Sequence, residues 1–157
     1  MTALIGDHKS LVDTNVVVYA YDIDDPRKQQ IAVDLLSLLS SKSMLVFSVQ
    51  VFNEISSVMM QKRRSSPLPP SKVHEILREL AATGEVLPMT SEMTFSALEA
   101  MQRHGFSFWD ALIWASAKEN GVSVIYTEDF QHGRDIEGVQ IVNPFVEEPV
   151  NPAGSEV

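Results

Sequence analysis

Short apolar runs alternate with longer stretches of helical periodicity along most of the chain. The runs fall at residues 9–13, 44–47, 86–87, 122–126 and 139–142. Between them, apolar residues recur at a spacing of three and four, which is typical of amphipathic helices. This alternation predicts an α/β protein in which helices cover both faces of a mostly parallel sheet of five strands.

Local signals mark where some of the predicted helices begin and end. Asp25-Pro26 is typical of a helix start, and Asn120-Gly121 is typical of a helix end. The basic residues 62–64 are expected to close a helix, since their charge suits its negative end. Three prolines predict a loop over residues 65–70.

The 157-residue chain contains no cysteine, and no apolar run approaches the roughly 18 residues that span a membrane. Its N-terminus lacks the charged and then apolar order of a signal peptide, so we expect a cytoplasmic protein that does not bind membranes. We expect a single domain over residues 1–146, followed by a flexible acidic tail over residues 147–157.

The net charge of −9, from 21 acidic and 12 basic residues, argues against indiscriminate binding of nucleic acid through clustered cations. An acidic protein still acts on nucleic acid when metal ions neutralise its site, or when a basic partner completes the surface. The positions of the acids are therefore more informative than their number.

Acidic side chains stand near the ends of several predicted strands. Asp13 ends the first apolar run, and Glu54 lies just past the second. Asp129 follows the fourth run, and Asp110 begins the long helix that leads to it. Ligands bind at the carboxyl ends of the strands in open α/β sheets, so these acids would meet at one edge. Crowded carboxylates repel one another unless a cation lies among them, and oxygen ligands suit Mg²⁺ or Mn²⁺.

Each of these acids also has an ordinary structural explanation. Asp110 follows Ser107 in the S-x-x-D arrangement of a capping box, and Asp13 fits an Asx-turn after a strand. Glu54 fits a solvated helix position, and Asp129 fits an ordinary loop. It is the coincidence of four acids at one predicted edge that favours a functional site.

Four short motifs resemble those of PIN domains, the nuclease domains of VapC-type toxins. Residues 11–16, Leu-Val-Asp-Thr-Asn-Val, resemble the opening motif, and Asn53-Glu54 resembles the second. The third is found in residues 108–113, Phe-Trp-Asp-Ala-Leu-Ile, and the fourth in residues 126–130, Tyr-Thr-Glu-Asp-Phe. Their order and spacing extend the resemblance over roughly residues 9–145.

The resemblance implies a three-layer α/β/α sandwich and an endoribonuclease that depends on Mg²⁺ or Mn²⁺ to hydrolyse RNA phosphodiester bonds. It also implies a toxin of a type II toxin–antitoxin pair, which forms a homodimer and is silenced by a cognate antitoxin. The acids that would bind the metal are Asp13, Glu54, Asp110 and Asp129. Asn15 and Thr127 would orient these acids or a bound water.

Two other functions stay open. A phosphatase-type phosphoryl-transfer domain would carry a second aspartate two residues after the first, where this chain has Asn15. A non-catalytic PIN-like module would bind RNA or protein without cleaving it. The presence of all four acids favours catalysis, and a calorimetric titration with Mn²⁺ would separate the two cases.

Overall fold

The computed structural model describes residues 7–61, 64–130 and 132–146. Its centre is a six-stranded sheet in the order β3-β2-β1-β4-β6-β5. The strands are β1 (Ser10–Val12), β2 (Leu45–Ser48), β3 (Glu85–Leu87), β4 (Val124–Tyr126), β5 (Asp135–Ile136) and β6 (Val139–Val142). All neighbouring pairs are parallel except β5 and β6, which are antiparallel.

Strand β5 is the one strand that the pattern of apolar runs failed to predict, so the predicted number of five was wrong. It has only two residues, and its register pairs Ile136 with Val139 of β6. The two residues between the strands, Glu137 and Gly138, both have positive φ angles, of 52° and 88°. Positive φ at both central residues is what a two-residue hairpin turn of type I′ requires.

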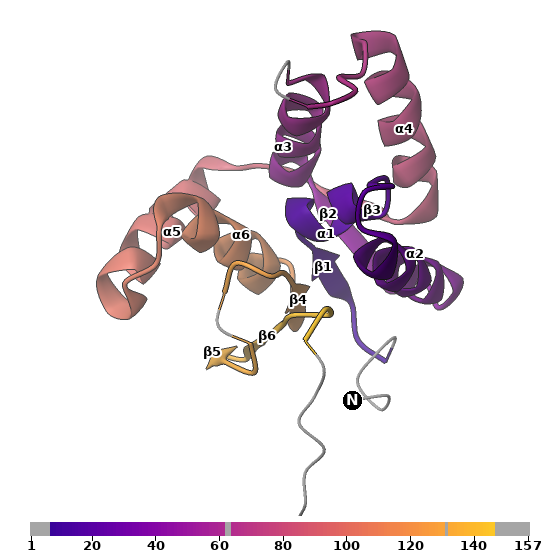
Figure 1. Cartoon of the computed structure of the whole chain (residues 1–157). Helices are drawn as coiled ribbons and strands as arrows, with labels where there is room; N and C mark the ends of the chain where they lie inside the picture. The colour runs from indigo at the N-terminus through magenta and orange to yellow at the C-terminus, as the bar shows by residue number, and fades with distance from the viewer. Residues whose placement is uncertain (1–6, 62–63, 131, 147–157) are drawn as a thin grey trace, which may run out of the picture.

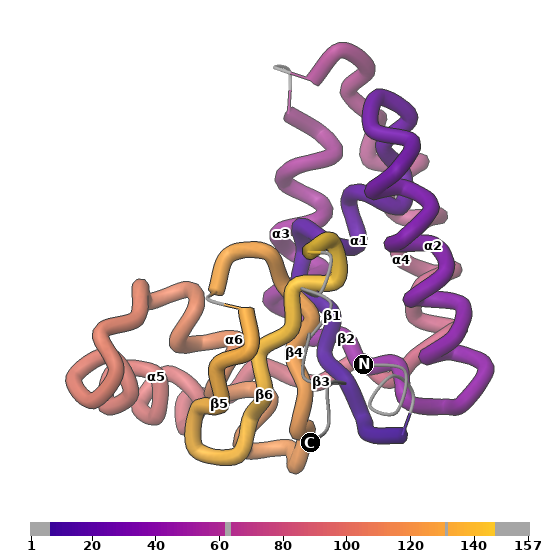
Figure 2. The backbone as a smooth tube through the Cα atoms, turned by 60° about the horizontal axis from the view of Figure 1, so that its bottom comes forward, coloured from indigo at the N-terminus to yellow at the C-terminus, as the bar shows by residue number. Residues whose placement is uncertain are grey.

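Six helices in the described part of the chain surround the sheet. They are α1 (Thr14–Tyr19), α2 (Pro26–Ser41), α3 (Val49–Met60), α4 (Pro70–Thr83), α5 (Ser91–His104) and α6 (Phe108–Glu119). Helices α1 to α4 gather on one side of the sheet, and α5 and α6 pack together on the other (Figure 1). The same grouping is visible along the backbone in Figure 2. The three-layer α/β/α arrangement is therefore confirmed.

The predicted helix ends follow from local hydrogen bonds. The Asp25 side chain accepts a hydrogen bond from the backbone N–H of Lys28, and Pro26 takes the first position of α2. Asn120 is the C-cap of α6. Helix α3 ends at Met60, so the predicted basic helix end does not belong to it, and Lys62 and Arg63 lie outside the described residues.

The segment before α4 is the predicted loop, although Pro70 already begins the helix. The predicted tail over residues 147–157 lies outside the described residues. Within the described ranges, no helix is both long enough and apolar enough to cross a membrane.

Strand β1 lies at the centre of the sheet, and all three of its residues are buried. The chain moves outward from β1 to β2 and β3, and then returns to place β4 on the other side of β1. The strand order thus reverses between β1 and β4. In open α/β sheets the crevice at such a reversal, outside the carboxyl ends of the strands, is where ligands bind.

Candidate functional site

Asp13 lies at this reversal, directly after β1. Its backbone N–H donates to the carbonyl oxygen of Tyr126 at 2.9 Å, which continues the pairing with β4. Its side chain caps α1 by accepting from the backbone N–H of Thr14 at 2.7 Å. The hydroxyl of Thr127 donates to the other carboxylate oxygen at 2.8 Å. The carboxylate is therefore fixed by one contact from each side of the crevice.

The surroundings of Asp13 disfavour its negative charge. The residue is only 3% exposed, and this burial raises the pKa of its carboxyl group from 3.8 to about 7. Hydrogen bonds from Thr127 and Thr14 lower the pKa, whereas the charges of Glu54 and Asp129 raise it further. Near neutral pH the group is thus divided between its two protonation states, unless a cation stabilises the ionised one.

Glu54 approaches Asp13 from the first half of α3. One of its carboxylate oxygens accepts from the hydroxyl of Thr14 at 2.8 Å, and the other accepts from the side-chain amide of Gln50 at 2.9 Å. The same amide nitrogen donates to the carbonyl oxygen of Trp109 at 3.2 Å. Gln50, which is 2% exposed, therefore ties Glu54 to the first turn of α6.

Asp129 follows β4 in a loop that hydrogen bonds organise. Its backbone N–H donates to the hydroxyl oxygen of Thr127 at 3.1 Å. The side-chain oxygen of Asn15 accepts from the backbone N–H of Glu128 at 3.4 Å. Burial raises the pKa of Asp129, the charge of Asp110 raises it further, and a hydrogen bond from Asn15 opposes both. The charges of Glu128 and Glu54 raise the pKa of Asp129 by smaller amounts, so these carboxylates share one electrostatic environment.

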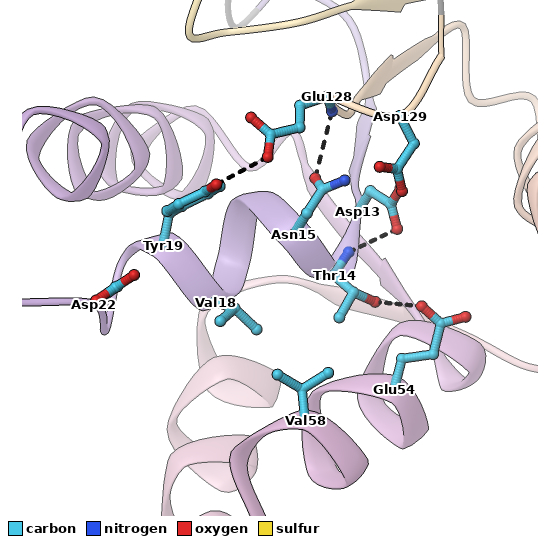
Figure 3. A pocket seen from close by; sticks show the side chains of 10 residues that line it. All are labelled: Asp13, Thr14, Asn15, Val18, Tyr19, Asp22, Glu54, Val58, Glu128 and Asp129. Atoms are coloured by element: carbon cyan, nitrogen blue, oxygen red, sulfur yellow. Dashed lines mark hydrogen bonds between the residues drawn. The ribbon is translucent and has the colours of Figure 1, made fainter. Parts of the chain in front are cut away.

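A cleft of about 410 Å³ opens over three of the four acids. Its lining consists of Asp13, Thr14, Asn15, Val18, Tyr19, Asp22, Glu54, Val58, Glu128 and Asp129 (Figure 3). Asp110 is not part of this lining. It lies in the first turn of α6, where its backbone N–H donates to the Ser107 hydroxyl at 3.3 Å in the predicted capping arrangement.

The family of the chain follows from its sequence and agrees with this arrangement. The PIN domain family model matches residues 10–134. The chain belongs to the PIN domain family. A search of curated proteins by sequence gives no significant match.

Solved structures of toxins resemble this PIN domain in fold. The sarcin–ricin loop cleaving toxin VapC20 from Mycobacterium tuberculosis is 23% identical, with a TM-score of 0.61 over 76% of this chain and 89% of that one. VapBC2 from Rickettsia felis, bound to a promoter DNA fragment, is 17% identical, with a TM-score of 0.61 over 84% and 96%. A toxin–antitoxin complex from Klebsiella pneumoniae is 17% identical, with a TM-score of 0.57 over 86% and 97%.

Two residues that hold the acids of the PIN domain were missed by sequence reasoning. Thr14 has no assigned role in the sequence motifs, yet its hydroxyl donates a hydrogen bond to Glu54. Gln50 lies four residues before Glu54 on α3, and this spacing places two side chains on the same helix face. The spacing is therefore a signal from which Gln50 could have been found.

Glu128 is another residue whose contacts were not predicted. Its carboxylate accepts from the hydroxyl of Tyr19 at 2.9 Å and pairs with the ammonium group of Lys28 at 2.9 Å. The Lys28 nitrogen also lies 4.5 Å from the centre of the Tyr19 ring. Glu128 thus binds the start of α2, and it points away from Asp13 in Figure 3.

The four acids suit a divalent cation by their chemistry. PIN-domain nucleases generally use divalent metal ions. Among the described residues, no three acidic or histidine side chains form a ready-made metal cluster. The carboxylates of Asp13 and Glu54 instead accept hydrogen bonds from the hydroxyl groups of Thr127 and Thr14. These hydroxyl groups would serve as outer contacts of the two acids in a metal site. Burial raises the pKa of Asp13 and of Asp129, and the charges of neighbouring acids raise both further. A cation among these carboxylates would therefore favour their ionised forms.

Proposed function

We propose that this protein is a metal-dependent endoribonuclease that hydrolyses RNA phosphodiester bonds, and that it is the toxin of a type II toxin–antitoxin pair. One observation carries the proposal: Asp13, Glu54 and Asp129, from separate elements, line one cleft at the strand reversal, and Asp13 is buried there with its pKa raised to about 7. The charge of Asp110 acts on Asp129 from the first turn of α6. Such a group of oxygen ligands suits Mg²⁺ or Mn²⁺.

Four acids would share the binding of the metal. Asp13 and Asp110 would bind it directly, and Glu54 and Asp129 would complete the set of oxygen ligands. When bound, Mg²⁺ or Mn²⁺ would neutralise the carboxylates and activate a water for attack on phosphorus. Because Asp13 is buried, water would compete less with the metal for its carboxylate.

Asn15 and Thr127 would position the acids. The hydroxyl of Thr127 donates to the carboxylate of Asp13 and accepts from the backbone N–H of Asp129. This single hydroxyl therefore fixes the position of Asp13 relative to the backbone of Asp129. Asn15 contacts both Thr127 and the backbone of Glu128, at 3.5 and 3.4 Å. These contacts restrict the loop after β4 and hold Asp129 over the cleft.

An antitoxin is the proposed protein partner. The similar structures from Rickettsia felis and Klebsiella pneumoniae are toxin–antitoxin assemblies, which supports a cognate antitoxin for this chain. The homodimer implied by the sequence motifs stays a prediction.

The test of the proposed function is cleavage of total cellular RNA by the purified protein, with Mg²⁺ or Mn²⁺ and with EDTA. We expect discrete fragments that require the metal, because only a selective nuclease leaves defined ends. The fragments should vanish with Asp110→Asn, which keeps the side-chain size but removes a metal-binding charge. Cleavage that persists in EDTA or with Asp110→Asn would contradict the proposal.

Replacing Gln50 with methionine is expected to weaken the binding of Mn²⁺ by about 10- to 100-fold, as is typical when an outer partner of a metal ligand is lost. Methionine has nearly the size of glutamine but donates no hydrogen bond, so Glu54 loses its contact at 2.9 Å. Calorimetric titration with Mn²⁺ measures the change. The control is Gln29→Met, which removes an amide bound to the Ala20 carbonyl, away from the acids. Equal Mn²⁺ affinity in Gln50→Met and the unmodified protein would refute the role of Gln50.

A further inference from the structure

Two adjacent acids follow β4, and their carboxylates take different directions. Glu128 and Asp129 both line the cleft. The side chain of Asp129 points towards Asp13, whereas that of Glu128 points towards Tyr19 (Figure 3). The loop after β4 thus brings two carboxylates to the cleft and turns only one of them towards Asp13.

Tyr19 and Lys28 hold the second carboxylate in place. One carboxylate oxygen of Glu128 accepts from the Tyr19 hydroxyl at 2.9 Å, and the other accepts from the Lys28 ammonium group at 2.9 Å. The ammonium group also donates to the Tyr19 hydroxyl at 3.1 Å, so each of the three groups contacts the other two. Both oxygens of Glu128 are therefore occupied on the side of the loop away from Asp13.

Neighbouring segments fix these three groups. The backbone N–H of Glu128 donates to the side-chain oxygen of Asn15 at 3.4 Å. The ring of Phe145, which follows β6, lies 5.2 Å from the Lys28 nitrogen and packs edge-on against Tyr19, with ring centres 5.1 Å apart. Helices α1 and α2 and the segments after β4 and β6 thus all contribute to the position of the Glu128 carboxylate.

An ordinary exposed ion pair would have little effect on the protein. The pair of Lys72 and Glu75 on α4 is of that kind, with side chains that are 51% and 58% exposed. Lys28 and Glu128 are each only 26% exposed, and their pair lies beside the acids. The hydrogen bond with Glu128 raises the pKa of Lys28, so the ammonium group stays positively charged.

We propose that Lys28 is a positioning residue of the metal site: together with Tyr19 it holds the Glu128 carboxylate away from the metal, so that Asp129 is the ligand from this loop. The inference rests on the proposed binding of a metal by the acids, and it concerns how many carboxylates reach the ion. Without its partners, Glu128 would be free to rotate into the cleft that it already lines. A further carboxylate would strengthen the binding of a divalent cation and occupy a position that water or phosphate needs.

The test is a double-mutant cycle on Mn²⁺ affinity, measured by calorimetric titration at low ionic strength. Lys28→Met should bind Mn²⁺ roughly 10- to 30-fold more tightly, the effect of a unit charge on a divalent cation at contact distance in water. Glu128→Gln alone should change the affinity by less than about threefold, because this carboxylate is already paired. Adding Glu128→Gln to Lys28→Met should remove the gain.

The cycle distinguishes a released ligand from charges that act only at a distance. Distant charges give effects that add, whereas release of Glu128 makes the effect of Glu128→Gln depend on Lys28. Additive effects would overturn the inference. It would also be overturned if Lys28→Met weakened Mn²⁺ binding and Glu128→Gln did not relieve the loss, because Lys28 would then only brace the loop.

Two further variants support the cycle. Tyr19→Phe keeps the ring that packs against Phe145 and removes one contact of Glu128, so Mn²⁺ affinity should rise by less than in Lys28→Met. This variant tests the inference even if Lys28→Met fails to fold, which urea unfolding would reveal. The matched control is Lys72→Met, which breaks an ion pair on α4 and should leave Mn²⁺ affinity unchanged.

RNA cleavage by the same proteins separates this inference from the proposed function. Lys28→Met should cleave more slowly although it binds Mn²⁺ more tightly, and adding Glu128→Gln should restore the rate. Additive effects on Mn²⁺ affinity in a protein that cleaves RNA would overturn the inference and leave the ribonuclease standing. A non-additive cycle in a protein that leaves RNA intact would support the role of Lys28 and contradict the proposed function alone.

Discussion

Replacing Asp13 with asparagine is expected to lower RNA cleavage by more than about 100-fold, which exceeds the usual effect of losing an outer contact of a metal. The amide removes the most buried negative charge of the site and cannot replace it as an anionic ligand. Its oxygen still accepts from the backbone N–H of Thr14, and its nitrogen can donate to the hydroxyl of Thr127. The fold should therefore be retained while activity is lost.

The measurement is the rate of metal-dependent cleavage, with urea unfolding to show that the variant is folded. Asp25→Asn is the matched control, because Asp25 caps α2 away from the acids and asparagine caps a helix equally well. Its cleavage rate should equal that of the unmodified protein. Undiminished cleavage with Asp13→Asn would show that Asp13 does not belong to the catalytic site.

Without divalent metal, the protein is expected to lose stability as the pH rises from about 4 to about 7. The pKa of the Asp13 carboxyl group is raised by burial from its ordinary value of 3.8 to about 7 in the folded protein. Over this range the folded state therefore holds a proton that the unfolded state has lost. The free energy of unfolding then falls as pH increases. At about 1.4 kcal/mol per pKa unit, the contribution of this one group amounts to roughly 4 kcal/mol, fully lost above pH 7.

Urea unfolding at pH 5 and pH 7.5 in EDTA measures this loss. The Asp13→Asn variant should show a smaller loss, since its amide does not titrate. Addition of Mn²⁺ at pH 7.5 should raise the urea concentration at the midpoint of unfolding more for the unmodified protein than for the variant, because the cation favours the ionised carboxylate. The assignment of this loss to Asp13 would be contradicted if the Mn²⁺-free unmodified protein were more stable at pH 7.5 than at pH 5 while the stability of Asp13→Asn stayed unchanged between the two pH values.

Much of the fold could be predicted because local signals agree with tertiary contacts. Asp25 and Pro26 begin α2 as the pattern indicates, since the cap bond involves residues within one turn. Strand β5 could not be found in the same way. Its two residues are too few for a periodic pattern, and its turn depends on the positive φ angles of Glu137 and Gly138.

The candidate site shows a similar division. The sequence indicates which acids stand near strand ends, and the structure brings Asp13, Glu54 and Asp129 to one cleft. The contacts that fix these acids join distant parts of the chain, as when Gln50 binds the carbonyl of Trp109. Pairings over such sequence separations depend on how the helices pack, and no periodicity within one segment reveals them.

The four acids are spread from Asp13 to Asp129, and three of them, Asp13, Glu54 and Asp129, line one cleft where β1 and β4 lie side by side. The last of them to be translated follows β4, near the end of the domain. A nascent chain that has not yet produced β4 therefore holds three separate carboxylates and no complete site. If the protein cleaves RNA as proposed, it stays harmless to the ribosome and messenger that are making it until β4 and Asp129 have been translated.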